Sequence, residues 1–182
     1  MTIEEITIYT IGHSTRLLED FIWILKKYGI TTVADVRTVP RSAFNPQFNI
    51  DSLPASLKAA GIGYEHIRGL GGLRHPKKDS PNTGWQNYSF RGFADYMLTA
   101  DFHENLEKLI ALGREGKVAV MCAEAVPFRC HRSLIADALV VRGIKVMHIM
   151  SEKKAQEHKL NPMATVETGN IIYAGQTAEK TK

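Results

Sequence analysis

Short apolar runs alternate with helix-like stretches along most of this chain, and this alternation limits the possible folds more than any other feature. Five runs have the pattern of strands, at residues 6–11, 31–36, 64–67, 117–121 and 145–150. Between them lie five stretches with helical spacing, at residues 18–28, 52–60, 93–98, 102–112 and 134–141. Strands that alternate with helices favour parallel pairing and right-handed crossovers. The sequence therefore predicts one α/β domain of three αβα layers with a mostly parallel sheet.

The size and composition fit one globular domain. The chain has 182 residues, of which 44% are hydrophobic and 23% charged, so extensive disorder is excluded. We expect a single domain over residues 1–182, with its core at about residues 5–150 and a C-terminal extension at residues 151–182. Within the extension, residues 170–173 are expected to add a short edge strand, and the end from Gly175 onward is expected to be frayed.

Charge and cysteine content restrict the classes of partner. No apolar run is long enough to span a membrane and no secretion signal is visible, so we expect a cytoplasmic protein without a membrane partner. The two cysteines cannot form a disulfide framework, which agrees with a reducing compartment. The net charge of +4 favours anionic partners, including nucleic acid, although the C-terminal lysines can equally serve solubility. The sequence implies no cofactor and leaves the oligomeric state open.

Polar and ionisable residues gather where the predicted strands end. Ligands of open parallel sheets bind at the carboxyl ends of the strands. The residues in question are His13 and Ser14 after the first strand, Asp35, Arg37 and Arg41 at the second, and Cys122 and Glu124 at the fourth. Cys130, His131 and Arg132 then open the next helix. We expect these segments to meet at one mouth of the sheet and to form the functional site.

The stretch 121–133 contains both cysteines and admits three interpretations. In the first, Cys122 is a thiolate nucleophile, although the six residues between it and Arg129 exceed the Cys-x5-Arg spacing of cysteine phosphatases and include no glycine. In the second, a metal binds Cys122, Cys130, His131 and His13, without any Cys-x-x-Cys spacing to support it. In the third, which we favour, both cysteines are buried and Glu124, His131 and Arg132 face a ligand.

Specific roles follow from the residue types. Glu124 is the best candidate for a general acid or base, followed by His131 and by His13, which has no capping role after a glycine. Asp35 either pairs with Arg37 or takes part in catalysis. The arginines suit a planar anion, at Arg37 with Arg41 and at Arg132 beside a helix N-terminus, where Arg129 could assist.

A glycine-rich turn and an irregular loop follow the third predicted strand. The turn at residues 69–74 is either a flexible lid or a simple wide turn, because it lacks the strand-to-helix arrangement of dinucleotide-binding loops. Aromatic residues at positions 85, 88 and 90 either stack on a base or pin the loop to the core, and the second interpretation is favoured.

The chain resembles the family known as domain of unknown function 488. The resemblance rests on Thr10-Ile11-Gly12-His13-Ser14, Asp35-Val36-Arg37, Pro40, Ser42, Tyr64, Leu70-Gly71-Gly72, Cys122-Ala123-Glu124, Cys130-His131-Arg132, His148-Ile149 and the ending 158–173. It implies a small soluble α/β protein of prokaryotic type, with no established reaction to carry over. It also implies that Tyr64, Gly71 and Gly72 belong to the site and that His158 folds back toward it.

These observations lead to one main hypothesis and two alternatives. The main hypothesis is an enzyme that acts on a phosphate-bearing substrate, a nucleotide or nucleic acid, with Arg37, Arg41 and Arg132 on the anion and Glu124, His13 and His131 in acid–base roles. One alternative is a module that binds nucleic acid or nucleotide without catalysis. The other is a thiol- or metal-dependent enzyme centred on Cys122.

Overall fold

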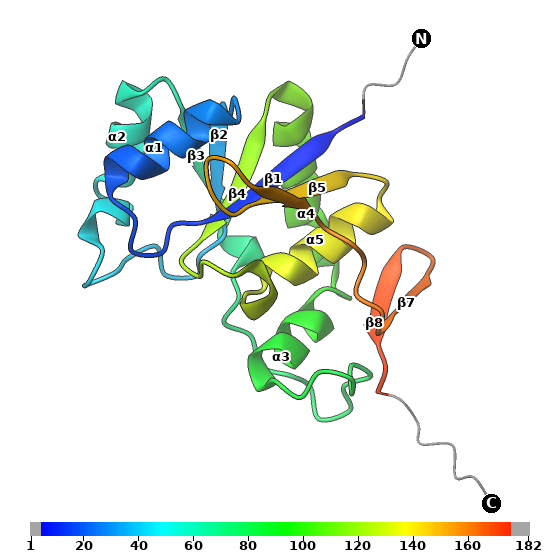
Figure 1. The fold of residues 1–182 in the computed structure, drawn as a ribbon. Helices are drawn as coiled ribbons and strands as arrows, with labels where there is room; N and C mark the ends of the chain where they lie inside the picture. Colours follow the sequence, from blue (N-terminus) through cyan, green and yellow to red (C-terminus); the bar gives the residue numbers. More distant parts are fainter. Residues whose placement is uncertain (1–4, 176–182) are drawn as a thin grey trace, which may run out of the picture.

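Five parallel strands and one antiparallel edge strand form the central sheet. The computed structural model of the protein describes residues 5–175. The sheet has the order β3-β2-β4-β1-β5-β6, with β6 antiparallel to β5 (Figure 1). The strands are β1 (Thr7–Gly12), β2 (Thr32–Asp35), β3 (Gly63–His66), β4 (Val118–Cys122), β5 (Lys145–Ile149) and β6 (Ala155–Glu157). The predicted α/β fold with a mostly parallel sheet is confirmed, and each of the first five strands agrees with a predicted run to within one or two residues.

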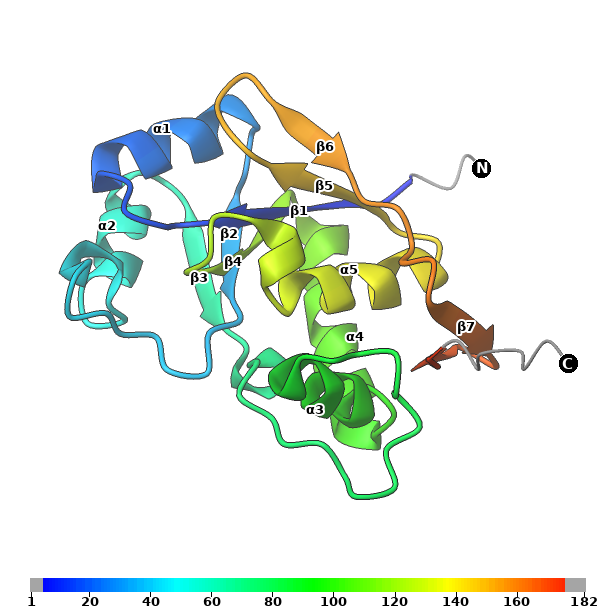
Figure 2. The same ribbon diagram turned by 60° about the horizontal axis from the view of Figure 1, so that its bottom comes forward.

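Helices cover both faces of this sheet (Figure 2). One face carries α1 (Leu18–Lys27) and α2 (Leu53–Ala59), and the other carries α3 (Tyr88–Tyr96), α4 (Ala100–Glu115) and α5 (Arg132–Val141). In β4, Ala119 and Met121 belong to the hydrophobic core on the α1–α2 face of the sheet. Val118 and Val120 belong to the core on the opposite face, with α3, α4 and α5. Because both faces of β4 are buried, its sequence is a continuous apolar run rather than an alternating one.

The irregular loop at residues 73–87 is fastened to α3 and to the C-terminal segment. The Asp95 carboxylate of α3 accepts three hydrogen bonds of 2.6–2.8 Å, from Lys77 N, Ser80 Oγ and Asn82 Nδ2. Trp85 packs edge-on against Phe90 and Tyr173, with ring centroids 5.2 and 5.5 Å apart. The aromatic residue at position 85 therefore pins the loop to the core, as the favoured interpretation of this loop expected.

The C-terminal segment differs from the expected edge strand. Residues 170–173 do form a strand, β8 (Asn170–Tyr173), but it pairs with β7 (Ala164–Glu167) in a separate hairpin. Tyr173 is buried, and its backbone N–H donates to Asn82 Oδ1 at 2.9 Å, which fixes β8 against the helical layer and away from the sheet. The expected frayed end from residue 176 lies outside the described residues. Over the described part of the chain, no helix combines the length and apolar character that a membrane span requires.

The chain reverses its direction of winding between β1 and β4. These two strands are neighbours in the sheet, yet β1 leads into α1 on one face and β4 leads toward α5 on the other. When neighbouring parallel strands send their connections to opposite faces, a crevice opens beyond their carboxyl ends. The topology therefore places a ligand-binding crevice where β1 and β4 end.

Candidate functional site

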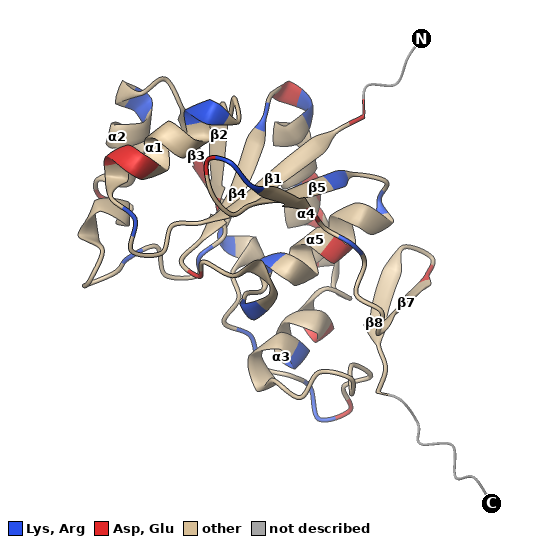
Figure 3. Ribbon diagram, viewed as in Figure 1, with Lys and Arg blue, Asp and Glu red and all other residues tan. Residues whose placement is uncertain are grey.

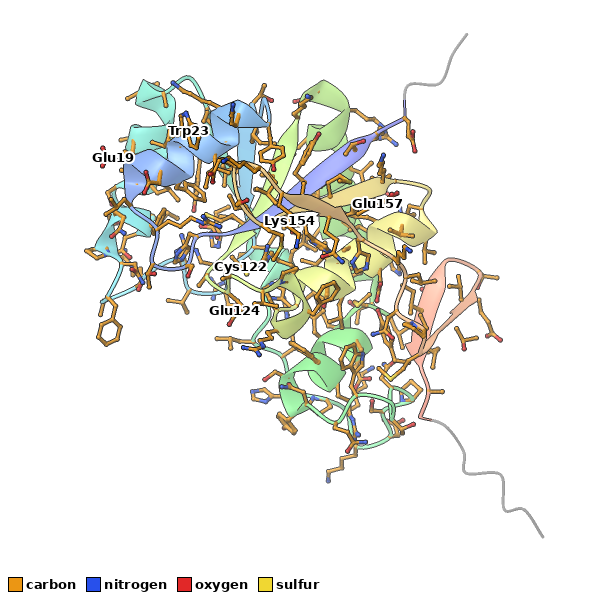
Figure 4. All side chains as sticks on the ribbon, viewed as in Figure 1. Glu19, Trp23, Cys122, Glu124, Lys154 and Glu157 are labelled. Atoms are coloured by element: carbon orange, nitrogen blue, oxygen red, sulfur yellow. The ribbon has the colours of Figure 1, made fainter. Side chains whose placement is uncertain are left out.

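The turn after β1 and the loop after β4 touch through their backbones. Gly12 lies opposite Cys122 in the sheet register, and the next two residues continue the pairing. His13 N donates to Cys122 O and Ser14 N donates to Ala123 O, both at 2.9 Å. A Cβ atom on Gly12 would lie 1.9 Å from the Glu124 carbonyl oxygen, so only glycine permits this approach. Figure 4 shows Cys122, the last residue of β4, close to Glu124 in the loop that follows.

A pocket of about 340 Å³ opens at this junction, and we call it the strand-end pocket. Eight of the predicted site residues line it: His13, Arg37, Arg41, Gly72, Cys122, Glu124, Cys130 and His131. The lining also includes residues outside the predicted set, among them Val39, Leu73, Phe90 and Arg129. Ser14, Asp35, Tyr64, Gly71, Arg132 and His158 do not line it. Sequence reasoning missed the apolar wall because nothing in the sequence relates residues 39, 73 and 90 to one another.

Arg37 is fully engaged by protein groups. Its Nε and Nη2 donate to the two Asp35 carboxylate oxygens at 2.9 and 2.8 Å, and Nη2 also donates to the Phe48 carbonyl at 2.7 Å. The Tyr64 hydroxyl donates to Asp35 Oδ2 at 2.5 Å, and burial together with this contact raises the pKa of Tyr64. Asp35 and Arg37 therefore form the structural ion pair considered above. An anion could use Arg37 only if these buried contacts broke.

His13 is held as a neutral imidazole. Its Nδ1 donates to the Ser14 carbonyl at 2.8 Å, so Nε2 carries the lone pair and accepts from Arg37 Nη1 at 3.3 Å. The ring stacks on Phe48 with centroids 4.4 Å apart, and burial lowers the pKa of His13. Acid–base chemistry at His13 would require one of its two contacts to break.

Arg132 also binds protein groups rather than open space. Its Nε donates to Cys122 Sγ at 3.0 Å, Nη1 to Thr10 Oγ1 at 3.1 Å, and Nη2 to the Glu124 carbonyl at 2.5 Å. The side chain is 1% exposed. Arg132 therefore fixes the loop after β4 and one of the two sulfur atoms, whereas the sequence suggested that it faces a ligand.

A buried chain of hydrogen bonds supports Arg132 from behind. It runs from Thr10 Oγ1 to His148 Nδ1 at 2.6 Å, from His148 Nε2 to His158 Nδ1 at 2.8 Å, and from His158 Nε2 to Asp137 Oδ1 at 2.7 Å. Asp137 accepts and Arg132 donates, so each histidine carries its proton on Nε2. Burial, the neighbouring His158 and Arg132 lower the pKa of His148 to about 3, which keeps its ring neutral.

The buried hydrogen-bond chain from Thr10 to Asp137 determines where His158 lies. The family resemblance implied that His158 folds back toward the site, and the side chain is indeed buried in the domain, but behind Arg132 and away from the pocket. Sequence reasoning missed two of its partners, Thr10 and Asp137. A carboxylate in the middle of the apolar helix α5 and a hydroxyl inside β1 are the signals that could have found them, because buried polar groups require partners.

The two cysteines lie side by side at the floor of the strand-end pocket. Cys122 Sγ and Cys130 Sγ are 2.7 Å apart, and neither is in a disulfide. Cys130 lies two residues before α5, and Arg132 N, in the first turn of that helix, donates to Cys130 Sγ at 3.4 Å. The hydrogen bond from Cys122, the neighbouring His131 and Arg132 lower the pKa of Cys130, whereas burial raises the pKa of Cys122. These surroundings therefore favour Cys130 over Cys122 as the thiolate of the pair.

His131 is oriented toward this pair. Its Nε2 donates to the Val36 carbonyl at 3.0 Å, so Nδ1 faces Cys130 Sγ at 3.5 Å. The ring lies against Gly72, where a Cβ atom would come within 2.6 Å of His131 Nδ1. Gly71 supports the same turn, because a Cβ atom there would lie 2.4 Å from Thr38 Oγ1. The glycine-rich turn is therefore a packing surface for the histidine.

Three charged side chains remain at the mouth of the pocket. Glu124 is exposed, and its Oε1 accepts from Val126 N at 3.2 Å. Arg41 forms an ion pair with Asp51 on the surface. Arg129 is exposed at the pocket and has no ion-pair partner among residues 5–175. Arg129 is thus the most available cation for an anionic ligand, although the predicted site did not include it.

Charges of both signs are mixed along the ribbon, and the described residues contain no cluster suited to a metal ion. In Figure 3, basic and acidic residues are interspersed over the ribbon. Among the described residues, no group of three or more His, Cys, Asp or Glu side chains is arranged to hold a metal ion. The metal interpretation of the cysteines therefore gains no support from their geometry.

Comparison with known families agrees with the motifs. The family model described as Domain of unknown function DUF488 matches residues 17–139, about two thirds of the chain. The chain belongs to the DUF488 family. The matched stretch contains Asp35, Arg37, the cysteine pair and His131, whereas His13 and His158 lie outside it. No curated protein and no solved structure matches the chain.

Proposed function

We propose that this DUF488 protein is a thiol-dependent hydrolase that acts on a small phosphate-bearing substrate in the strand-end pocket. The observation that carries the proposal is the arrangement of three groups: Cys130 Sγ, His131 Nδ1 at 3.5 Å, and the Val36 carbonyl that orients the ring through Nε2. A nucleophile beside a base, with a third group fixing that base, is typical of covalent catalysis. Cys130 replaces Cys122 as the nucleophile considered from the sequence.

The same residues allow a balanced reaction. Cys130 reacts as the thiolate, and its Sγ forms a bond to the electrophilic acyl or phosphoryl centre while His131 Nδ1 carries the proton that the thiol gave up. The bond from that centre to the leaving group breaks, and the leaving group receives the proton from His131. Water then gives a proton to His131 and attacks the same centre, which breaks the bond to sulfur and releases the acid product. The Cys130 thiolate and the proton on His131 are thereby restored.

The pocket favours a small ligand with an anionic end. Arg37 and Arg132 are saturated, so Arg129 is the cation that we assign to the phosphate. Val39, Leu73 and Phe90 offer an apolar wall to the rest of the substrate. A volume of about 340 Å³ suits a single nucleotide or a sugar phosphate better than a duplex. Glu124, at the mouth, remains our candidate for the second acid–base group.

Hydrolysis of two chromogenic probes tests the proposal, p-nitrophenyl acetate for acyl and p-nitrophenyl phosphate for phosphoryl transfer. We expect measurable turnover of one probe, a loss of about 100-fold or more in Cys130→Ser, and a smaller loss in Cys122→Ser, because the Cys122 thiol supports the Cys130 nucleophile without replacing it. Arg129→Ala should raise the KM for the phosphate probe or for a competing nucleotide, whereas Arg114→Ala, at the end of α4, should not. Equal turnover in wild type and Cys130→Ser would refute the proposal.

The non-catalytic module remains the competing function, and Arg129 favours it equally. Titration with mononucleotides, followed by tryptophan fluorescence, separates the two. Binding that Arg129→Ala weakens, without any conversion of either probe, would support a binding module and contradict the hydrolase.

A further inference from the structure

We propose that Cys122 and Cys130 form a reversible dithiol–disulfide couple that is oxidised by small hydroperoxides. The proposal rests on the geometry of the pair and is independent of hydrolysis at the same site. It assigns a second, redox chemistry to the strand-end pocket.

The two sulfur atoms are already within reach of each other. Their separation is 2.7 Å, and a disulfide bond is about 2.05 Å long, so closure requires a movement of well under 1 Å. The cysteines come from separate places: Cys122 ends β4, and Cys130 directly follows the short turn η3 (Pro127–Arg129). They are the two cysteines of the chain, so no third thiol competes for pairing within one molecule.

Arg132 keeps both sulfur atoms in place. Its Nε binds Cys122 Sγ at 3.0 Å, and its backbone N–H binds Cys130 Sγ at 3.4 Å. Two sulfur atoms held by one residue cannot drift apart independently. The positive guanidinium also stabilises the thiolate, which is the species that reacts with peroxides.

The pair is reachable despite its burial. Both cysteines line the strand-end pocket, and Cys130 is 6% exposed against 3% for Cys122. Hydrogen peroxide is small enough to enter a pocket of about 340 Å³. Large oxidants, such as oxidised glutathione, have no comparable access to sulfur atoms at the pocket floor.

The oxidation proceeds in two balanced steps. The Cys130 thiolate attacks one oxygen of the hydroperoxide, so a sulfur–oxygen bond forms, the oxygen–oxygen bond breaks, and the leaving oxygen takes a proton from His131 or solvent. Cys130 is then a sulfenic acid. Cys122 Sγ attacks Cys130 Sγ, the sulfur–oxygen bond breaks, and water leaves with the Cys122 proton. An external dithiol such as dithiothreitol reduces the disulfide and restores both thiols.

The order of attack follows from the surroundings of each sulfur. Cys130 is the more exposed of the two and faces both His131 Nδ1 and the first turn of α5. Cys122 lies deeper and is the resolving thiol. The disulfide would also remove the nucleophile of the proposed hydrolase, and that consequence alone rests on the proposed function.

Intact-mass spectrometry of reduced protein treated with hydrogen peroxide tests the couple. We expect the wild type to lose two hydrogens per chain, to form no disulfide between chains and to recover on addition of dithiothreitol. In Cys122→Ser, Cys130 should stop at a sulfenic acid that dimedone traps. In Cys130→Ser, the remaining Cys122 thiol should react with hydrogen peroxide at least about tenfold more slowly than Cys130 does in the wild type, because Cys122 lies deeper and is not in the attacking position.

Several outcomes would overturn the couple: no reaction in the wild type, direct oxidation to sulfinic acid without a disulfide, or disulfides only between chains. Each is read by mass and needs no substrate. A protein that forms the disulfide but hydrolyses neither probe would leave the couple intact and refute the hydrolase. A protein that hydrolyses a probe but forms no disulfide would leave the hydrolase intact and refute the couple.

Discussion

Arg132 binds both cysteines, Cys122 through its guanidinium at 3.0 Å and Cys130 through its backbone N–H at 3.4 Å. A cation at the start of a helix is normally unfavourable, because the helix dipole is positive there. In this protein Cys130 Sγ, whose pKa its surroundings lower, accepts from the Arg132 N–H at that position. The group that faces the start of α5 is therefore part of the chain, where the sequence suggested a ligand.

Removing the Arg132 charge should raise the pKa of the cysteine pair. In Arg132→Met we expect alkylation by iodoacetamide at pH 7 to slow by about tenfold, and in Arg132→Lys by less, because a cation remains. The loss of the buried contacts should also destabilise the fold by about 3 kcal/mol. Rate against pH, measured below the denaturation midpoint of each variant, checks this. An unchanged pH profile in Arg132→Met would show that Arg132 does not set the pKa.

The far end of the buried hydrogen-bond chain should matter for stability. The Tyr173 hydroxyl donates to Asp137 Oδ2 at 2.7 Å, and Tyr173→Phe leaves that buried oxygen without this donor. We expect a loss of about 2 kcal/mol in the free energy of unfolding, measured by urea denaturation. Tyr88→Phe, at an exposed hydroxyl, is the matched control and should change stability by less than about 0.5 kcal/mol. Equal effects in the two variants would mean that the contact contributes nothing.

Gly12 should tolerate no side chain. In Gly12→Ala the new Cβ atom would meet the Glu124 carbonyl at 1.9 Å, and relief would pull the β1 turn away from Cys122. We expect a destabilisation of about 3 kcal/mol and faster alkylation of both cysteines as the pocket floor opens. Gly113→Ala in α4, where a Cβ atom meets only side-chain atoms, of Ile8 at 3.1 Å and of Ile6 at 3.3 Å, is the control. Comparable midpoints for both alanine variants would argue against the close approach.

Acidification should destabilise the fold through its buried histidines. Burial lowers the pKa of His13, and burial with the facing His158 and Arg132 lowers that of His148 to about 3. Below pH 6.5 the unfolded chain therefore binds more protons than the folded one, and stability falls as the pH falls toward the folded values. From pH 7.5 to pH 5, His148 alone should cost about 2 kcal/mol, and His13 adds to the loss.

Urea midpoints at the two pH values measure this dependence. His148→Asn, which preserves a donor and an acceptor, should flatten it, and His75→Gln, at an exposed ring, should leave it unchanged. A wild-type stability that is level or rising from pH 7.5 to pH 5 would contradict the neutral buried histidines.

Apolar periodicity in the sequence predicts most of the fold. Strands β1 to β5 and α1, α2, α4 and α5 are recognisable because each buries a face or a whole run. The exposed elements β6 and β7 escape such reasoning, since Ala155–Glu157 and Ala164–Glu167 bury almost nothing. The pairing of β8 with β7, rather than with the sheet, depends on Asn82, which lies far away in the sequence.

The location of the candidate site can also be predicted from the sequence, but the contacts of its residues cannot. Topology brings the ends of β1 and β4 together, and residue types indicate that edge before any coordinates exist. The sequence cannot show how donors are used, however. Arg37 and Arg132 look like anion-binding residues until their contacts with Asp35 and Cys122 are known. Arg129 is the same residue type, and only the structure shows that its side chain is exposed at the pocket while those of Arg37 and Arg132 are buried and hydrogen-bonded.

The pH dependence of Cys130 alkylation tests the central claim, a thiolate held by Arg132 and His131 at the pocket floor. Folded wild-type protein would be treated with iodoacetamide between pH 4 and pH 10, and Cys130 labelling followed by peptide mass spectrometry. We predict that labelling is half-maximal well below pH 8.5, the ordinary value for a free thiol, and that this shift disappears in Arg132→Met. Labelling that rises only above about pH 8.5, or that requires unfolding, would contradict the thiolate and the proposals built on it.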